Sequence, residues 1–362
     1  MKTISGKKVL VIAGDIGGWN AIAPVVEKLN QEGAQILIVL VGDSKKAHAN
    51  KNLTVNLSSK VDVAFVPDLV LIAASQSHEG TETTAEVLRE VSPKTPVLVV
   101  EDMYGSSIPI FTRLNEMFFT ARVCVIDIFA EQMLEKHIRS ANIIVTGGPQ
   151  FDRIAEMKNS WTDRRKAIRQ ILHVPDSGKL FLIAGQRNGT AEAIMLLVGL
   201  MEPADDWILV RQHPGATDLD KRLTATVLKS FSIPLIFPQE RIPADFKSTE
   251  DFLPAADFVL SGYSTTLRYA ILCGMPGVVF LGTPSFKWDM WDEKKITMAP
   301  EAMMGAGWYV RTQEDMRHVM NELEKGDKSE ELGVIKHNQS LLAQHADGHS
   351  ADRVLEQVLS MM

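Results

Sequence analysis

The chain has 362 residues, of which 45% are hydrophobic and 23% are charged, and its formal net charge is −7. This is the composition of an ordinary globular protein, and a chain of this length usually folds as two domains. The acidic balance excludes a general basic field that would hold nucleic acid, so any anion must be bound locally. Two cysteines, Cys124 and Cys273, are too few for a secreted disulfide framework, which favours a reducing, cytoplasmic compartment.

The first apolar run, Val9 to Ala13, is too short for a secretory leader and is followed directly by Gly14 and Asp15. It is therefore predicted to be a strand. No stretch approaches the ~20 apolar residues that span a bilayer, so no integral membrane segment is expected.

The first half of the chain alternates short β-branched runs with longer segments of helical periodicity, which is typical of βαβ units and a parallel sheet. The predicted strands are Val9 to Ala13, Gln35 to Val41, Val61 to Phe65, Leu69 to Ala73, Pro96 to Val100, Val123 to Ile126 and Ile143 to Thr146. The predicted helices are Ala21 to Gln31, Thr81 to Val91, Ile108 to Phe118 and Ala130 to Ser140. Together they predict one doubly wound domain.

A second series of the same kind follows a predicted hinge at about 147 to 160, where Gly147 to Pro149 interrupts the pattern. Its predicted strands are Leu180 to Ala184, Trp207 to Arg211, Pro234 to Phe237, Phe258 to Leu260 and Gly277 to Leu281. Its predicted helices are Thr162 to Leu172, Thr190 to Met201, Lys221 to Phe231, Thr265 to Cys273, Glu314 to Glu324, Leu332 to Ala346 and Ala351 to Met361.

The fold class expected is α/β, with two facing doubly wound Rossmann-like domains and a ligand cleft between them. The expected boundaries are 1–148 for the first domain and 149–350 for the second. A final helix over 351–362 has the first domain as its candidate packing partner.

The strongest candidate binding segment follows a predicted buried strand and begins a predicted helix. Ser264 is placed to cap that helix, and the free N–H groups of its first turn attract a phosphate or diphosphate. The predicted binding residues here are Ser261, Gly262, Ser264, Thr265 and Thr266. The alternative is that Ser264 and Thr265 only cap the helix.

Two further strand ends carry residues suited to a phosphate. Arg211 and His213 follow one predicted strand, and Pro214 holds His213 in an extended loop, where either side chain could donate to a phosphate oxygen. A histidine bonded only to backbone is the alternative. Gly185, Arg187 and Asn188 follow another strand, although many strand-to-helix turns favour such residues.

In the first half, the segment Gly14 to Asn20 lacks the G-x-G-x-x-G spacing, which disfavours a dehydrogenase. Gly17 and Gly18 would let an acceptor approach the backbone, and Asp15 would act as a general base. Rival bases end two other predicted strands, in Ser75 to Glu79 and in Glu101, Asp102 and Tyr104. Each has a helix cap or a solvated charge as its alternative.

No metal site is predicted. Asp289, Asp292 and Glu293 precede two lysines, which indicates a solvated charge run. The pairs Asp218 and Asp220, and His345 and His349, have metal-like spacings but lack the rest of a ligand set.

These motifs resemble those of the GT-B superfamily of nucleotide-sugar enzymes. His213 and Pro214 are similar to the His-Pro motif of bacterial capsule, sialyl and glycerophosphate transferases, and Ser261 to Thr266 looks like their Ser/Thr motif. Gly147 to Asp152 resembles their interdomain segment, and Gly185 to Arg187 the loop that opens their donor domain. The first domain is only generically similar.

The resemblance implies that His213, Ser264 and Thr265 contact the phosphate of a CMP-, CDP- or UDP-type donor, and that the transferase needs no metal and no cofactor. It implies a role in cell-surface glycan or glycoconjugate synthesis with an unknown acceptor, and a homodimer is compatible with it. A non-hydrolysing NDP-sugar 2-epimerase is the second interpretation, although the Gly-Thr-Arg-Pro-Glu loop and the His-Arg and paired-Glu patterns of that family are replaced here. Lipid-A-disaccharide synthase is also similar. A nucleotide-sugar-binding protein without activity is the alternative of another class.

Overall fold

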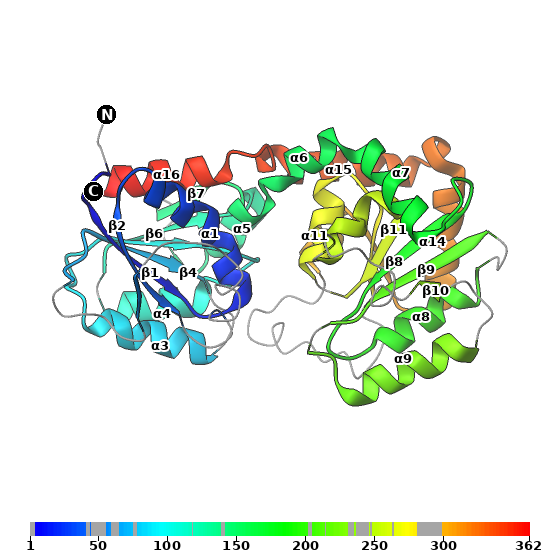
Figure 1. Ribbon diagram of the computed structural model, residues 1–362, viewed down its shortest axis with the longest axis horizontal. Helices are drawn as coiled ribbons and strands as arrows, with labels where there is room; N and C mark the ends of the chain where they lie inside the picture. The colour runs from blue at the N-terminus through cyan, green and yellow to red at the C-terminus, as the bar shows by residue number, and fades with distance from the viewer. Residues whose placement is uncertain are drawn as a thin grey trace. The chain divides into compact units, whose positions relative to one another are not determined.

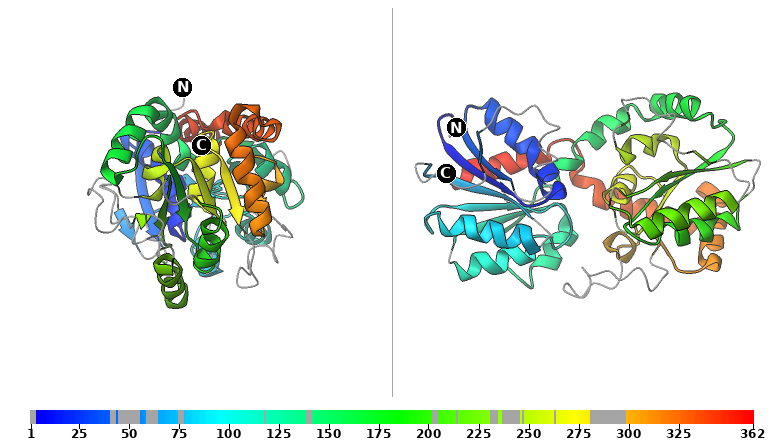
Figure 2. Two further views of the ribbon diagram at one scale, coloured as in Figure 1. Left: turned by 90° about the vertical axis from the view of Figure 1, so that its right-hand side faces the viewer. Right: turned by 60° about the horizontal axis from the view of Figure 1, so that its bottom comes forward.

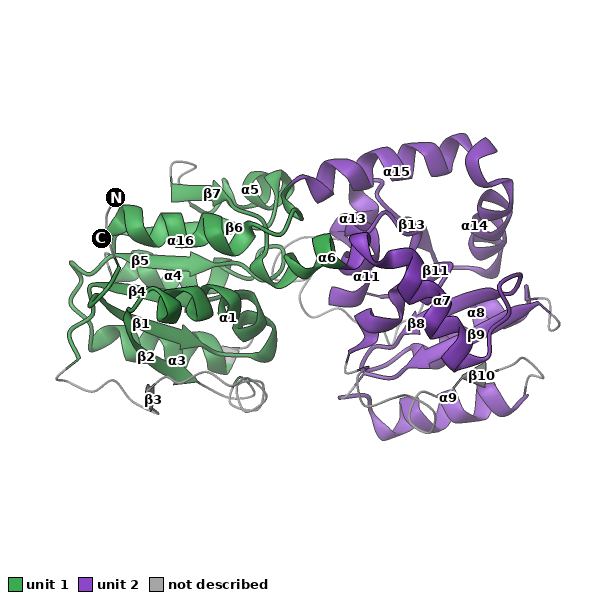
Figure 3. Ribbon diagram, turned by 45° about the horizontal axis from the view of Figure 1, so that its top comes forward, with its two compact units in different colours: residues 1–156, 345–362 green, residues 157–344 purple. Residues whose placement is uncertain are grey.

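The computed structural model describes residues 4–40, 44, 56–58, 65–74, 78–117, 119–138, 142–201, 205–213, 215–230, 235–236, 246, 248–262, 264–280 and 299–362. The chain divides into two compact units (Figure 3). Unit 1 consists of Met1–Glu156 and His345–Met362, and unit 2 consists of Met157–Gln344.

Unit 1 is built on a parallel sheet with the strand order β3-β2-β1-β4-β5-β6-β7. Its strands are β1 (Lys8–Ala13), β2 (Gln35–Leu40), β3 (Asn56–Ser58), β4 (Leu69–Ala73), β5 (Val97–Val100), β6 (Ala121–Val125) and β7 (Ile143–Val145). The central strands are continuous apolar runs because helices cover both faces of the sheet. Helices α1 (Ile16–Gln31) and α16 (Ser350–Met361) cover one face, and α3 (His78–Arg89) and α4 (Ile108–Glu116) cover the other (Figure 1).

The last helix of the chain belongs to the core of unit 1. Ala351, Val354, Leu355 and Val358 of α16 pack in one cluster with residues of α1 and the sheet, and α16 lies beside α1 (red and blue in Figure 2). The two carboxylate oxygens of Asp152 accept the N–H groups of Ser350 and Ala351, each at 2.8 Å, and so cap the start of α16.

Unit 2 contains a second parallel sheet, with the order β10-β9-β8-β11-β12-β13. Its strands are β8 (Lys179–Ala184), β9 (Asp206–Arg211), β10 (Leu235–Ile236), β11 (Phe258–Ser261), β12 (Gly277–Phe280) and β13 (Trp308–Val310). The helices that flank it include α7 (Trp161–Leu172), α8 (Thr190–Val198), α9 (Asp218–Ser230), α11 (Thr265–Leu272), α14 (Gln313–Lys325) and α15 (Glu330–Leu342). Shorter helical segments are α5 (Ile128–Leu134), η2 (Pro149–Phe151), α6 (Arg153–Asn159), η3 (Thr249–Ala255), α13 (Pro300–Met303), η4 (Gly326–Lys328) and η5 (Ala343–His345).

In both parallel sheets, the order in which successive strands are added reverses beside the first strand. In unit 1, β1 lies between β2 and β4, and in unit 2, β8 lies between β9 and β11. The predicted fold class, two doubly wound parallel-sheet domains, is therefore confirmed. None of the helices in the described ranges is long and apolar enough to cross a membrane.

Several predicted elements differ in extent from the observed ones. The helix predicted to begin at Ala21 begins five residues earlier, at Ile16, because Asp15 caps it there. Gly17 and Gly18, expected in a loop, therefore lie in the first turn of α1. The helix predicted over Ala130 to Ser140 ends at Leu134. The predicted strand Val61 to Phe65 lies largely outside the described residues.

A buried arginine fixes the start of β11, the strand that leads into the strongest candidate binding segment. Arg169 of α7 is 1% exposed, and it donates to Asp257 Oδ2 at 2.7 Å and to the carbonyl of Ala255 at 3.0 Å. Burial lowers the pKa of Arg169, and the Asp257 carboxylate opposes that shift. Because Asp257 also accepts the N–H of Leu180 at 2.6 Å, α7, β8 and β11 are tied together at one point.

Candidate functional site

The candidate site of unit 2 lies at the carboxyl ends of β8 and β11, where the strand order of the sheet reverses. Open α/β sheets bind ligands at such a point because the loops on its two sides run in opposite directions and leave a crevice. A small pocket is present here. It is lined by residues after β8 and β11, among them Gln186 and Ser261, and by Gly189 and Thr190 at the start of α8. Ser264, Thr265 and Thr266 are not among its lining residues.

The turn after β11 presents the start of α11. Ser264 is the N-cap residue, and its hydroxyl accepts the N–H of Leu267 at 3.2 Å. Within the described part of the chain, no acceptor is present for the backbone N–H groups of Thr265 and Thr266. These two N–H groups, at the positive end of the helix dipole, are suited to an anion.

The side chains of this turn differ in what they can offer a ligand. Thr265 is exposed, whereas Thr266 is buried and donates its hydroxyl to Glu250 Oε1 at 2.6 Å. Thr266 therefore offers its backbone N–H rather than its side chain. Ser261 is also buried, and its hydroxyl oxygen lies 3.1 Å from that of Ser264.

The turn after β8 leads into α8 and is held by hydrogen bonds to the end of β9 and the start of α9. Gly185 donates its N–H to the carbonyl of Arg211 at 2.8 Å, and a Cβ at Gly185 would lie 3.0 Å from that oxygen. Arg187 and Asn188 are exposed. Asn188 Oδ1 accepts the hydroxyl of Thr217 at 2.8 Å, so its amide is already held by the start of α9.

The N-terminus of α8 already has an anion of its own. Asp220, which is 3% exposed, accepts the N–H of Thr190 through Oδ1 at 3.0 Å. Helices α8 and α9 pack side by side (Figure 1), which brings this carboxylate to the first turn of α8. The two helix starts that flank the reversal point therefore differ: at α8 a carboxylate accepts a backbone N–H, whereas at α11 the Glu250 carboxylate accepts a side-chain hydroxyl.

His213 follows β9 in a state suited to hydrogen-bond donation. Its Nδ1 accepts the N–H of Gly215 at 2.9 Å, so the neutral ring carries its proton on Nε2. Burial lowers the pKa of His213, and the positive charge of Arg187 lowers it further. At neutral pH the ring is therefore uncharged and can donate from Nε2.

Arg211, at the end of the same strand, contacts an aromatic ring. Its guanidinium carbon lies 5.5 Å from the centre of the Phe252 ring. Burial lowers the pKa of Arg211, while the carboxylates of Glu250 and Asp251 raise it. Arg211 is half-buried and its positive charge faces these carboxylates of η3, so it already has partners within the protein.

The predicted residues of unit 1 have structural partners. Asp15 Oδ1 accepts the N–H of Gly18 at 2.7 Å and caps α1. A Cβ at Gly18 would lie 2.5 Å from the carbonyl oxygen of Ala74, so glycine is needed for α1 to pack against β4. A Cβ at Gly17 would lie 2.6 Å from Asp102 Oδ2, which places that carboxylate beside the start of α1.

The rival bases are also engaged. Glu101 Oε1 accepts the hydroxyl of Ser107 at 3.0 Å, and Tyr104 donates its hydroxyl to Asp127 Oδ2 at 2.7 Å. Glu79 is exposed at the start of α3. Ser75 to Ser77 lie outside the described residues, as do Pro214, Asp289, Asp292 and Glu293.

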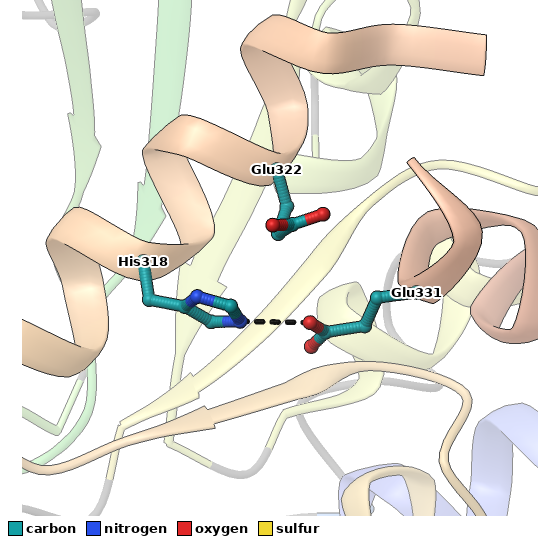
Figure 4. A group of neighbouring side chains, drawn as sticks. All are labelled: His318, Glu322 and Glu331. Carbon is teal, nitrogen blue, oxygen red and sulfur yellow. Dashed lines mark hydrogen bonds and ion pairs between the residues drawn. The ribbon is translucent and has the colours of Figure 1, made fainter. Parts of the chain in front are cut away.

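The described residues contain one group with the donor set of a metal site, His318, Glu322 and Glu331 (Figure 4). Its members already have protein partners. His318 Nε2 lies 2.7 Å from Glu331 Oε2, and Trp308 donates to Glu331 Oε1 at 2.6 Å. Glu322 binds Lys325 and the hydroxyl of Ser329. A cation would have to replace these contacts.

Acidic residues at the two metal-like spacings pair with basic side chains of the protein. Asp218 forms an exposed ion pair with Lys221 at 3.7 Å. Asp347, between His345 and His349, binds Arg353 at 2.8 Å. This hydrogen bond holds the pKa of Asp347 well below its usual value.

Three residues of the site were not predicted. Gln186 lines the pocket, Glu250 accepts a hydrogen bond from the Thr266 hydroxyl, and Asp220 caps α8. Gln186 adjoins the predicted Gly185 and Arg187, so its neighbourhood was a usable signal. Glu250 and Asp220 contact residues 16 and 30 positions away, and no local pattern marks such contacts.

No protein-family model matches the chain, and no curated protein matches it. Solved structures do. The S. aureus MnaA co-structure with UDP is 16% identical with a TM-score of 0.65, and the match covers 98% of both chains. The UDP-GlcNAc 2-epimerase from Neisseria meningitidis bound to UDP-GlcNAc is 14% identical with a TM-score of 0.64, covering 98% of this chain and 100% of that one.

A third similar structure is the wall teichoic acid polymerase TagF with CDPG. It is 12% identical with a TM-score of 0.59, and the match covers 98% of this chain and 89% of that one. Identities this low establish shared folding and not shared chemistry. The chain therefore has the two-domain α/β fold of these proteins over almost its whole length.

Proposed function

We propose that the chain is a GT-B-like transferase that takes a nucleotide-activated donor, with unit 2 holding the donor's phosphate at the start of α11. The observation that carries the proposal is the contrast between two helix starts beside one reversal point. Asp220 occupies the start of α8, whereas the N–H groups of Thr265 and Thr266 have no acceptor among the described residues.

The proposed mechanism is electrostatic. When the bond to the donor phosphate breaks, negative charge develops on the departing nucleotide. Preorganised N–H donors and a helix dipole stabilise such charge without reorganising during the reaction. The N–H groups of α11, the Ser264 hydroxyl and the Nε2–H of neutral His213 are the donors assigned to this role. Asp15 is assigned the deprotonation of the acceptor hydroxyl.

The similar structures include both 2-epimerases and a polymerase, so a matching fold does not choose between the two reactions. The transferase is favoured because Gly14 to Gly18, Gln186 to Asn188 and Thr265 to Arg268 replace the epimerase patterns. An epimerase would convert one nucleotide sugar into its isomer without any acceptor. A transferase would release free nucleotide only when an acceptor accepts the group.

The first test is binding. Thermal unfolding is measured in a chelator with CMP, CDP, UDP, GDP and their sugar or glycerol conjugates, because a ligand that binds only the native state raises the unfolding temperature. At least one nucleoside diphosphate is expected to stabilise the wild type. Thr265→Pro removes one N–H of the α11 start and is expected to abolish the shift, whereas Ser230→Ala, an exposed serine of α9, should keep it.

The second test is turnover. The stabilising conjugate is incubated with enzyme and its products are separated by chromatography. Acceptor-dependent release of nucleotide supports the transferase. Conversion of the donor into an isomer would contradict the transferase and support the epimerase. If no nucleotide stabilises the protein, the proposal as a whole is wrong.

A further inference from the structure

A chain of hydrogen bonds links the two sides of the reversal point through the side chain of Gln186. Gln186 Nε2 lies 3.1 Å from Ser261 Oγ. Ser261 Oγ lies 2.7 Å from the carbonyl oxygen of Ala184 and 3.1 Å from Ser264 Oγ. Ser264 is the N-cap residue of α11, so these hydrogen bonds connect the end of β8 with the start of the helix proposed to bind phosphate.

Counting protons fixes the direction of each bond. A carbonyl oxygen can only accept, so the single hydroxyl proton of Ser261 is given to Ala184. Ser261 Oγ must then accept from its two other neighbours. Gln186 therefore turns its NH₂ group toward Ser261, and Ser264 satisfies its contact only by donating its own proton.

This arrangement matters when a phosphate arrives. Ser264 can turn its proton to a phosphate oxygen only by withdrawing it from Ser261, which is 3% exposed. A buried acceptor that loses its donor costs free energy. With Gln186 still donating, Ser261 Oγ keeps one accepted hydrogen bond during the change, beside the one that it donates to Ala184.

We infer that Gln186 is a positioning residue for phosphate binding. It releases the Ser264 hydroxyl toward the phosphate by keeping Ser261 satisfied. The inference rests on the proposed function, because it needs a phosphate at the start of α11. It goes beyond that function by assigning a residue that acts through Ser261 and Ser264 and need not touch the ligand.

The test compares a nucleoside diphosphate with its parent nucleoside. Gln186→Met keeps the length of the side chain and removes its donor. Its affinity for CDP or UDP, whichever stabilises the wild type, should fall ~3- to 10-fold, the range expected for one hydrogen bond. Its affinity for cytidine or uridine should change less than ~2-fold, because a nucleoside has no phosphate for Ser264 to reach.

Further variants make the test more specific. Gln186→Glu places a carboxylate opposite an oxygen that has no proton to give, so it should weaken diphosphate binding more than Gln186→Met. In a Ser264→Ala background, Gln186→Met should have little further effect, since the hydroxyl that it releases is gone. Gln170→Met, at an exposed position of α7, is the matched control and should bind like the wild type.

The outcomes separate the inference from the proposed function. If the wild type binds no nucleoside diphosphate, the proposed function fails and this inference falls with it. If the wild type binds a nucleoside diphosphate and the folded variants Gln186→Met and Gln186→Glu bind it as tightly as the wild type does, only the inference fails. Equal losses for the diphosphate and the nucleoside would show that Gln186 shapes the pocket in general, and would also overturn it.

Discussion

His213 is a histidine whose protonation should be visible in the stability of the protein. Burial and Arg187 lower its pKa below the ordinary 6.5. The folded protein therefore binds fewer protons at this site than the unfolded chain does, and stability rises with pH across the interval between the two pKa values. The contribution is complete above the unfolded pKa and is lost as the pH falls through the folded one.

The expected result is a pH-dependent difference between the wild type and His213→Ala. The wild type should lose more of its free energy of unfolding than the variant does between about pH 7.5 and about pH 5.5, as measured by urea denaturation. Arg187→Gln removes the charge that lowers the pKa and should reduce the loss. A difference that stays constant over this range would contradict the assigned state of His213.

Asp15 has a structural role that is observed and a catalytic role that is proposed, and one pair of variants separates them. Asparagine caps helices about as well as aspartate, so Asp15→Asn should keep the stability of unit 1, whereas Asp15→Ala should lose about 1 kcal/mol. If Asp15 is the general base, both variants should lose turnover by ~10²-fold or more. Full turnover in Asp15→Asn would leave it as a helix cap alone.

The α8–α9 pair offers a matched test of a buried carboxylate. Asp220→Ala removes the acceptor of the Thr190 N–H and should lower the free energy of unfolding of unit 2 by about 1–2 kcal/mol. Asp218→Ala, two residues earlier with a side chain 93% exposed, should change it by less than about 0.5 kcal/mol. Chemical denaturation followed by circular dichroism measures both.

Asp220→Ala also tests where the phosphate binds. If α11 alone holds it, the Kd for the nucleoside diphosphate should be unchanged in folded Asp220→Ala. A much weaker or much tighter affinity would mean that the start of α8 takes part in phosphate binding.

The central strands were the most predictable elements. Leu69 to Ala73 is β4 as predicted, and the predicted strands Leu180 to Ala184 and Trp207 to Arg211 each extend one residue further toward the N-terminus. Such strands are buried on both faces, so their apolar runs are unbroken and easily recognised. Strands β3 and β13 have three residues each and were not predicted, whereas the equally short β7 lies within the predicted strand Ile143 to Thr146.

The site shows the same division between local and long-range information. Two segments could be identified from the sequence, Gly185 to Asn188 and Ser261 to Thr266, because each joins a predicted strand to a predicted helix. The partners that decide what each segment can bind could not be predicted, because they depend on tertiary packing. Asp220 reaches α8 from another helix, and Glu250 reaches Thr266 from η3.

At the scale of the whole chain, the C-terminus returns to the unit in which the N-terminus lies. Arg353 of α16 donates to the carbonyl of Thr146 at 2.7 Å, and Lys28 of α1 forms an ion pair with Asp352 at 2.6 Å. Unit 1 is thus completed only when the last residues are present. Unit 2 is a continuous segment, and the candidate phosphate site is formed by its residues.

This asymmetry predicts that a change in α16 damages unit 1 and spares phosphate binding. Val354 is fully buried in the cluster that joins α16 to α1, so Val354→Asp places an unpaired charge in an apolar core and should cost several kcal/mol, on the order of 3 or more. Hydrogen exchange should show lost protection in α1 and β1, with β8 and β11 unchanged. Glu356→Ala, at an exposed position of the same helix, is the control and should leave both units protected.

Because the donors of the α11 start all belong to unit 2, Val354→Asp should keep wild-type affinity for the nucleoside diphosphate under conditions where unit 2 stays folded. Loss of that affinity with unit 2 still protected would show that unit 1 contributes to the binding of the nucleotide.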